Sequence, residues 1–354
     1  NTLSEDEAGH LWISSMKGEP LCYDLKTETF VDFTPEGTCP RYKLINHIGD
    51  LTWLWDRNLG CTVVSGNGTE LKSQRLDSYN STLPDNRVNY ILGGTGGRVW
   101  IGTRKGLAYF RDGNSTIVDA TLDFISGTII GGIDYHITRD GQVYTLAQDG
   151  LSLEYAASLD LGDDAISAVA GTGRQWLIQS RNSGAFLFDT DNLVFIPAPK
   201  EWNIPRGRVE NDRQGNSYIT NGSGNILFFD RSGGRIHKII VPGDGENTHS
   251  ERFRYHRTSE GTLWITERTS GLYRYDIEKN ELSRIDFNNN SRNNPNNVLL
   301  YTIEDREGNL WSASEFYGIF KLVPVSRGVS FINFGKNIDA NRICMVSTAS
   351  TREV

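Results

Sequence analysis

Cysteine, methionine and histidine are scarce in this chain. Its 354 residues include 4 Cys, 2 Met and 6 His. The cysteines show no CxxC spacing and no histidine partners at zinc intervals, so no zinc module is predicted. We expect buried thiols, with a Cys39–Cys61 or Cys22–Cys61 disulfide as the alternative if the chain is extracytoplasmic. The four cysteines are Cys22, Cys39, Cys61 and Cys344.

Long apolar runs and an excess of positive charge are also missing. No stretch approaches the roughly 18 apolar residues that a membrane-spanning helix needs. The chain carries 36 Lys and Arg against 44 Asp and Glu, a net charge of −8. Such a chain is a poor candidate for binding nucleic acid or an anionic membrane through its overall field. It begins at Asn1 without a basic and apolar leader, and we expect a mature or excised segment.

Helical patterning is almost absent, and a repeat takes its place. The stretch GTLWITERTSGLYRYD at 261–276 has near-copies that begin at residues 9, 97 and 308. Weaker copies, with Tyr or one extra residue, bring the number of modules to eight, spaced about 32 to 48 residues apart. Periods near 40 to 50 residues are typical of propeller blades. The glycine–tryptophan pairs, three residues apart, are Gly9–Trp12, Gly97–Trp100, Gly173–Trp176, Gly261–Trp264 and Gly308–Trp311.

Each module is predicted to form four short strands. Apolar and polar residues alternate with period two, and links rich in Gly or Asn separate the strands. We therefore expect an all-β propeller of seven or eight four-stranded antiparallel blades over residues 1–334. Residues 335–354 are expected to begin a further repeat or to supply a ring-closing strand.

The repeated residues have predicted structural roles. The five tryptophans should pack between blades, and the preceding glycines should adopt the left-handed backbone of a tight hairpin. Acidic residues before the glycines are expected to stabilise turns, because each turn has too few carboxylates for a calcium loop. These turn residues are Asp6, Asp140, Asp212 and Asp305.

The repeats resemble those of the two-component regulator propeller family. GGRVWIGTRKGLAYFRD and EGTLWITERTSGLYRYDIEKNELSRID match that pattern of an acidic turn, Gly, Leu-Trp-Ile-Gly-Thr and Gly-Leu-x-x-Tyr-Asp. The resemblance covers nearly the whole chain, strongly in the modules at 9, 97, 261 and 308.

The resemblance implies the periplasmic sensor region of a Bacteroides-type hybrid two-component system, of which this chain would be the first propeller. A second propeller, a β-sandwich domain, a membrane helix, a histidine kinase and DNA-binding parts would lie elsewhere in the protein. The implied input is an oligosaccharide, the output is transcription of glycan-utilisation genes, and the sensor is expected to be a homodimer. No direct contact with nucleic acid, no catalytic residue, no metal and no cofactor are expected for this segment.

The loops between the second and third strands, and those between blades, are the predicted ligand rim, because function tends to lie on loops. Arginines recur there and would favour an acidic sugar; the alternative is a solvated rim on which they pair with acids such as Asp56. Trp202 lies in a loop between prolines, where it is exposed for stacking, docked on its own scaffold or docked on the second propeller. Trp55 and Tyr317 also stand outside the repeated aromatic layer. The candidate ligand-binding residues are Arg57, Arg104, Arg181, Trp202, Glu267, Arg268 and Tyr317.

Two other function classes stay open. The propeller could be an interaction or dimerisation scaffold without a ligand of its own. It could also be a glycan-active enzyme, since propellers host enzymes. No carboxylate pair, GxSxG motif or histidine cluster singles out a catalytic site, which makes the enzyme the weaker alternative.

Overall fold

A computed structural model describes most of the chain. The described residues are 2–14, 19–33, 40–172, 175–204, 207–211, 216–220, 224–230, 235–242, 253–258, 260–267, 271–285, 299–304, 310–314, 318–322 and 329–332. Cys39, Arg268, Tyr317, Cys344, Asp212 and Asp305 lie outside them, as do residues 333–354. The predicted role of 335–354 therefore stays a prediction.

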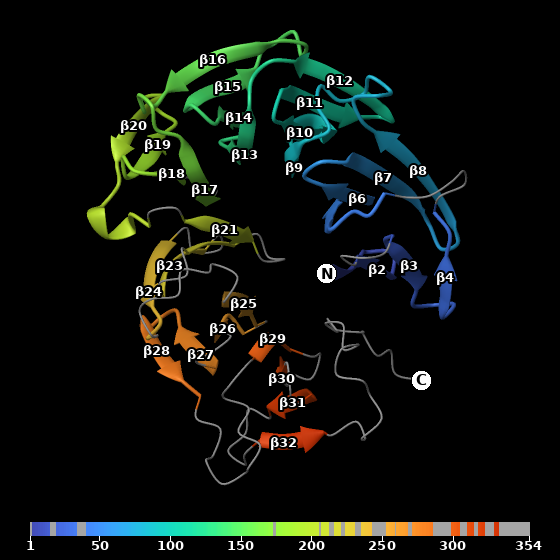
Figure 1. The fold of residues 1–354 in the computed structure, drawn as a ribbon, viewed down its shortest axis with the longest axis vertical. Helices are drawn as coiled ribbons and strands as arrows, with labels where there is room; N and C mark the ends of the chain where they lie inside the picture. Colours follow the sequence, from blue (N-terminus) through green and yellow to red (C-terminus); the bar gives the residue numbers. More distant parts are fainter. Residues whose placement is uncertain are drawn as a thin grey trace. The chain divides into compact units, whose positions relative to one another are not determined.

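In the described residues the chain forms eight four-stranded sheets, each an antiparallel meander in sequence order (Figure 1). We call them blades 1 to 8. Blades 1 and 2 comprise β1 (Thr2–Glu5), β2 (His10–Ser14), β3 (Leu21–Asp24), β4 (Thr29–Val31), β5 (Leu44–Ile48), β6 (Leu51–Asp56), β7 (Gly60–Asn67) and β8 (Glu70–Leu76). Blades 3 and 4 comprise β9 (Val88–Gly93), β10 (Val99–Thr103), β11 (Gly106–Arg111), β12 (Asn114–Asp119), β13 (Phe124–Ile130), β14 (Ile133–Thr138), β15 (Gln142–Leu146) and β16 (Leu153–Ser158).

The second half of the chain repeats the pattern. Blades 5 and 6 comprise β17 (Ile166–Thr172), β18 (Gln175–Ser180), β19 (Ala185–Asp189), β20 (Val194–Pro197), β21 (Arg208–Asn211), β22 (Ser217–Thr220), β23 (Asn225–Asp230) and β24 (Arg235–Ile240). Blades 7 and 8 comprise β25 (Phe253–Arg257), β26 (Leu263–Glu267), β27 (Gly271–Asp276), β28 (Glu281–Arg284), β29 (Leu299–Glu304), β30 (Leu310–Ser314), β31 (Gly318–Leu322) and β32 (Val329–Ile332). Two short 3-10 helices, η1 (Thr95–Gly97) and η2 (Lys200–Trp202), are the helices of the described part.

This succession of four-stranded meanders is the repeat of a β-propeller, so the predicted fold class is confirmed. The sequence predicted seven or eight blades, and the described residues form eight. Two compact units divide the chain. The first is Asn1–Ile166 with Gly173–Trp176 and Phe188–Ile196, and the second is Ser167–Thr172 with Leu177–Leu187 and Pro197–Val354.

The repeated tryptophans are core residues to different degrees. Trp12, Trp100 and Trp176 are at most 1% exposed, as the repeat predicts. Trp264 and Trp311 are only half-buried. Trp264 packs on a small cluster in which two of the described residues, both leucines, are buried. Two leucines provide too little apolar surface to cover an indole. The burial of the repeated tryptophan therefore differs between blades, although other residues of blade 7, such as Leu263 and Ile265, are completely buried.

The glycine and aspartate predictions hold wherever the turns are described. Gly9, Gly97, Gly141 and Gly261 have φ between +73° and +94°, the left-handed region that favours glycine. The Asp6 carboxylate accepts hydrogen bonds from the backbone N–H of His10 at 2.9 Å and from the Trp12 indole at 2.8 Å. The acidic residue thus closes the turn and holds the core tryptophan.

Cys22 and Cys61 are both buried free thiols, so a Cys22–Cys61 disulfide is wrong. Cys22 packs with Trp12 in one hydrophobic cluster, whereas Cys61 packs with Trp53 in another. The expectation of buried thiols is correct for these two residues.

Candidate functional site

The predicted rim arginines lie in the expected turns. Arg57 lies between β6 and β7, Arg104 between β10 and β11, and both side chains are exposed. The backbone N–H of Arg104 donates to the carbonyl of Arg87 at 3.0 Å. Asp56, expected to pair with a rim arginine, instead lies 3.5 Å from Lys43 Nζ. Arg181 is likewise exposed, but it belongs to the other compact unit.

Glu267 does not occupy the expected rim. Its side chain is 1% exposed at the end of β26, where the residue pairs with Phe253 and Gly271 in the sheet. A carboxylate enclosed in this way cannot reach a ligand at the surface. The error arose because the loop was expected to begin at residue 266, whereas β26 continues to Glu267.

Trp202 is docked on its own scaffold, one of the three alternatives that the sequence left open. It ends η2 and is half-buried against a cluster that includes Leu177 and Ile204. Its carbonyl accepts a hydrogen bond from the Gln179 side-chain amide, whose oxygen accepts the Ile204 backbone N–H at 3.1 Å. Trp55 is also inside the protein, 8% exposed, and its indole donates to Asn46 Oδ1 at 2.6 Å.

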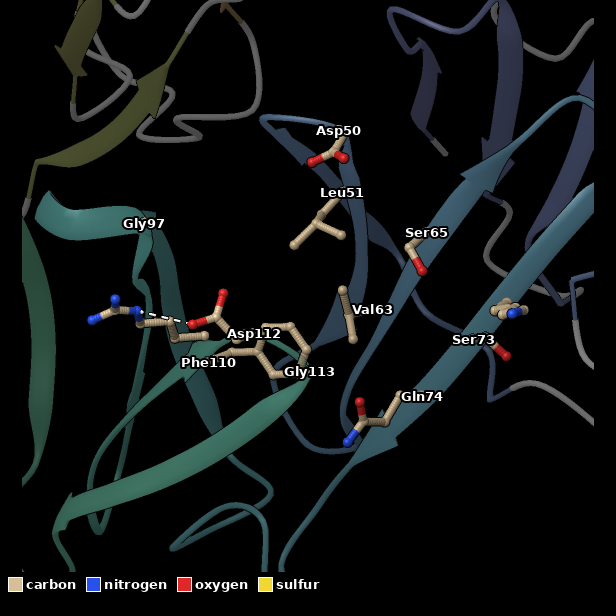
Figure 2. Close-up of a pocket in the computed structure, with 12 residues that line it drawn as sticks. Asp50, Leu51, Val63, Ser65, Ser73, Gln74, Gly97, Phe110, Asp112 and Gly113 are labelled. Atoms are coloured by element: carbon tan, nitrogen blue, oxygen red, sulfur yellow. Dashed lines mark ion pairs between the residues drawn. The ribbon is translucent and has the colours of Figure 1, made fainter.

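A cavity that the sequence did not predict lies between blades 2 and 3 (Figure 2). Its volume is about 530 Å³, inside the range of about 300–1,000 Å³ typical of small-molecule sites. The β5–β6 turn, the β7–β8 hairpin and the β11–β12 turn surround it. The lining residues are Asp50, Leu51, Val63, Ser65, Lys72, Ser73, Gln74, Gly97, Phe110, Arg111, Asp112 and Gly113.

This cavity is at the opposite end of the blades from the predicted rim. In a four-stranded meander the first and third turns lie at one end of the sheet and the second turn at the other. Asp50 and Asp112 are in first and third turns, whereas Arg57 and Arg104 are in second turns. The sequence search was confined to the second turns and the loops between blades, so it missed this end.

Local packing sets the apolar floor of the cavity. Val63 and Phe110 are 4% and 6% exposed and belong to one hydrophobic cluster. The Phe110 ring contacts the Trp53 ring edge-on, with centroids 5.4 Å apart. Because Trp53 is completely buried, Phe110 has a fixed position at the base of the site.

Hydrogen-bonding groups stand around this floor. Figure 2 shows Asp50, Ser65, Ser73 and Gln74 on the side of blade 2, and Asp112 on the side of blade 3. Arg111 Nε lies 3.2 Å from Asp112 Oδ2, so this pair is neutral as a unit. Hydroxyls, an amide and charged groups above an aliphatic and aromatic base can bind a ligand that has many hydroxyls and one apolar face.

A smaller cavity of about 210 Å³ lies between blades 1 and 2, at the same end of the sheets. Asp50 and Leu51 line both cavities. Burial acts to raise the pKa of Asp6 in the smaller cavity, but hydrogen bonds from Trp12 and His10 outweigh it and hold the pKa below the ordinary value. The remaining lining residues are Glu7, Ala8, His47, Gly49, Thr52 and Gly66.

No group of three or more His, Cys, Asp and Glu side chains suited to a metal ion occurs in the part of the chain that the structure describes. Over that same part, none of the helices is long and apolar enough to cross a membrane.

Comparison of sequences gave no match: no family model matches the chain, and no curated protein matches it. Comparison of structures gave many. The chain is similar to the extracellular domain of BT4673 from B. thetaiotaomicron in two structures, with 17% and 16% identity and a TM-score of 0.43. The first structure describes BT4673 as a one-component system and the second as a hybrid two-component system. The alignments cover 90% of this chain and 51% of that one, so the chain spans about half the length of that domain.

Two further structures are similar over most of their lengths. The computationally designed Ika8 protein has 10% identity and a TM-score of 0.53, with 90% of this chain and 94% of that chain covered. The dihydro-heme d1 dehydrogenase NirN has 12% identity and a TM-score of 0.58, with 90% and 71% covered. At such identities a similarity establishes the fold and not the chemistry. The structures similar to this all-β propeller include extracellular domains of B. thetaiotaomicron two-component systems.

Proposed function

We propose that this chain is a ligand-sensing propeller from the periplasmic region of a hybrid two-component system, and that it binds an oligosaccharide. The cavity between blades 2 and 3 is the observation that carries the proposal. It has the volume of a small-molecule site and combines an apolar base with hydroxyl, amide and charged groups. The resemblance of the repeats to the regulator propeller family supports the sensor role.

The proposed ligand chemistry follows from the lining. Gln74, Ser65 and Ser73 offer donors and acceptors that match sugar hydroxyls. Leu51, which is half-buried, offers an apolar surface for the face of a pyranose ring, and the largely buried Phe110 and Val63 lie beside it in the lining. Lys72 and the Arg111–Asp112 pair supply charge-assisted hydrogen bonds, which are stronger than neutral ones.

The remaining parts of the proposal come from the family resemblance. The propeller would work in the periplasm beside a second propeller and a β-sandwich of the same protein, within a homodimer. Ligand would favour one dimer arrangement over another and so control a kinase and the transcription of glycan-utilisation genes. The propeller itself would use no cofactor and catalyse no reaction.

Binding to a glycan panel tests this proposal. Thermal shift and calorimetry of this chain against neutral and acidic oligosaccharides should identify one class that binds saturably, because a ligand of the native state raises its stability. Lys72→Ala and Gln74→Ala should weaken binding about tenfold or more, the cost of one or two lost hydrogen bonds.

The predicted rim supplies the matched controls. Arg57→Ala and Arg104→Ala remove exposed cations at the other end of blades 2 and 3 and should leave binding unchanged. If only these two variants lost binding, the ligand site would lie at the predicted rim, and an acidic sugar would again be the expected ligand. Absence of binding to any glycan would favour the interaction scaffold, and turnover of a glycan would favour the enzyme.

A further inference from the structure

The two cavities adjoin each other at two places. The first is the β5–β6 turn, where Asp50 and Leu51 line both. The second is the end of β7, where Ser65 lines the larger cavity and the next residue, Gly66, lines the smaller. Both cavities lie within the first compact unit. They therefore flank one ridge, formed by Asp50 and Leu51, at one end of blades 1 to 3.

The smaller cavity is too small for an independent ligand site, and we call it the annex of the larger cavity. Its volume of about 210 Å³ is below the range of about 300–1,000 Å³ in which small-molecule sites fall, whereas the larger cavity is within it. A ligand held in the larger cavity would gain further contacts by extending over the ridge.

Side chains of the smaller cavity are already held in place. His47 Nε2 is 2.6 Å from the Ser4 hydroxyl, and His47 Nδ1 is 3.0 Å from the Thr52 hydroxyl. Asp6 is held by the Trp12 indole and by His10. Groups fixed in this way lose little freedom when a ligand binds, which favours affinity.

The wall between the cavities has a backbone that requires glycine. Gly66 has a φ of +120°, and a Cβ there would lie 2.2 Å from the carbonyl oxygen of Glu70. The close approach of β7 and β8 at this point keeps the hairpin narrow beside the ridge. A side chain at residue 66 is therefore excluded, and the backbone itself forms this part of the smaller cavity.

Charge in the two cavities argues against an acidic chain. The larger cavity balances Lys72 and Arg111 against Asp50 and Asp112. The smaller has carboxylates and no lysine or arginine among its lining residues. A uronate or sulfated unit in the smaller cavity would meet like charge without a compensating cation.

We propose that the two cavities are subsites of a single groove that holds a linear, neutral oligosaccharide across the Asp50–Leu51 ridge. This inference rests on the proposed function and adds to it the shape and charge of the ligand. Affinity then grows with chain length, because a unit in the annex is tethered to the units already bound in the larger cavity.

Calorimetric titration with matched oligosaccharide series tests this. Neutral gluco-, xylo-, manno- and galacto-oligosaccharides of two to six units are compared with oligogalacturonates of the same lengths. In the neutral series that binds, the Kd should fall about tenfold or more from two units to five, as tethered subsites predict. The galacturonates should bind more weakly at every length.

A variant that fills only the annex separates the two subsites. Ala8 is exposed in the β1–β2 turn and lines the smaller cavity alone. Ala8→Trp should lower the affinity for the five-unit chain to that for the two-unit chain and leave the two-unit affinity unchanged. Glu154→Ala, an exposed change on β16 away from both cavities, is the control, and far-UV circular dichroism verifies folding.

The outcomes are distinct. Affinity that is independent of length, or a five-unit affinity that Ala8→Trp leaves intact, overturns the groove while the proposed function stands. Preference for the galacturonates overturns the charge argument. No binding by any series overturns the proposed function, and the groove with it.

Discussion

The indole N–H of Trp100 donates a hydrogen bond to a carboxylate oxygen of Asp134, 2.8 Å away in the neighbouring blade. The same carboxylate accepts the backbone N–H of Thr95 at 2.9 Å and the Thr95 hydroxyl at 3.0 Å. The repeated tryptophan thus joins blades 3 and 4 by a polar contact as well as by packing. Trp53, its counterpart in blade 2, is as deeply buried, yet its indole N–H is without a hydrogen-bond partner in the described structure.

Asp134→Ala should therefore destabilise the protein. Loss of the carboxylate leaves the buried indole N–H without an acceptor, at a cost of about 1–3 kcal/mol. Urea unfolding of the variant and the parent measures the difference. Asp112→Ala, which removes an exposed ion pair with Arg111, is the control and should cost less than about 1 kcal/mol. Equal effects of the two changes would show that the interblade hydrogen bond contributes little.

His136 should make stability depend on pH. Burial lowers the pKa of His136 from 6.5 to about 4, against a smaller opposing effect of Asp134. The unfolded chain then binds a proton between pH 6.5 and 4 that the folded protein does not. Stability should be complete above pH 6.5 and should fall as the pH decreases toward 4, with a slope of up to about 1.4 kcal/mol per pH unit.

Unfolding midpoints from pH 7.5 to 4 measure this effect. His136→Gln removes the titrating group, although the Tyr90 hydroxyl, 2.8 Å from His136 Nδ1, then needs a new partner. The variant should be less stable at pH 7 but should show a shallower slope between pH 6.5 and 4. An unchanged slope would assign the acid sensitivity to other groups.

Gly102→Ala should be destabilising because of the Tyr90 ring. A Cβ at residue 102 would lie 1.9 Å from a ring carbon of Tyr90, and Tyr90 is held by His136. Overpacking of this kind costs about 1–3 kcal/mol. In a double-mutant cycle with Tyr90→Leu the two changes should couple by about 0.5 kcal/mol or more, because the smaller side chain relieves the clash. Strict additivity would contradict this explanation.

Cys22 and Cys61 should not react while the protein is folded. Burial raises the pKa of the Cys22 thiol to about 12 and raises that of Cys61 as well, so little of the reactive thiolate forms near neutral pH. Iodoacetamide labelling followed by peptide mass spectrometry should find both residues unmodified in the native protein and modified in urea. Rapid native labelling of either residue would contradict its burial.

The repeat made the fold predictable. Glycine before tryptophan at a fixed distance predicted the turns and the burial of Trp12, Trp100 and Trp176, because the sign of φ and the burial of these residues recur with the module. Trp264 was predicted less well, since its burial depends on Leu272 of its own blade and on Leu310 of the neighbouring blade. The Cys22–Cys61 alternative failed for a similar reason, because the two cysteines occupy different clusters.

The candidate site was harder to predict. The cavity is built by a long hairpin in blade 2 facing a turn of blade 3, and no motif marks residues that meet only in three dimensions. One signal was present: GCTVVSGNGTELKSQRL at 60–76 is a hairpin with strands of 8 and 7 residues, longer than its counterparts in the other modules. An extended hairpin beside a short one leaves a recess, and that length difference could have directed attention to this end of the blades.

Hydrogen–deuterium exchange with and without a saturating oligosaccharide locates the bound ligand on the propeller. Exchange should slow in residues 49–51, 63–74 and 110–113, which surround the larger cavity, and should not change in the turns at 56–60 and 103–106. Protection of those two turns with no change around the cavity would contradict the proposed site and place the ligand at the opposite end of the propeller.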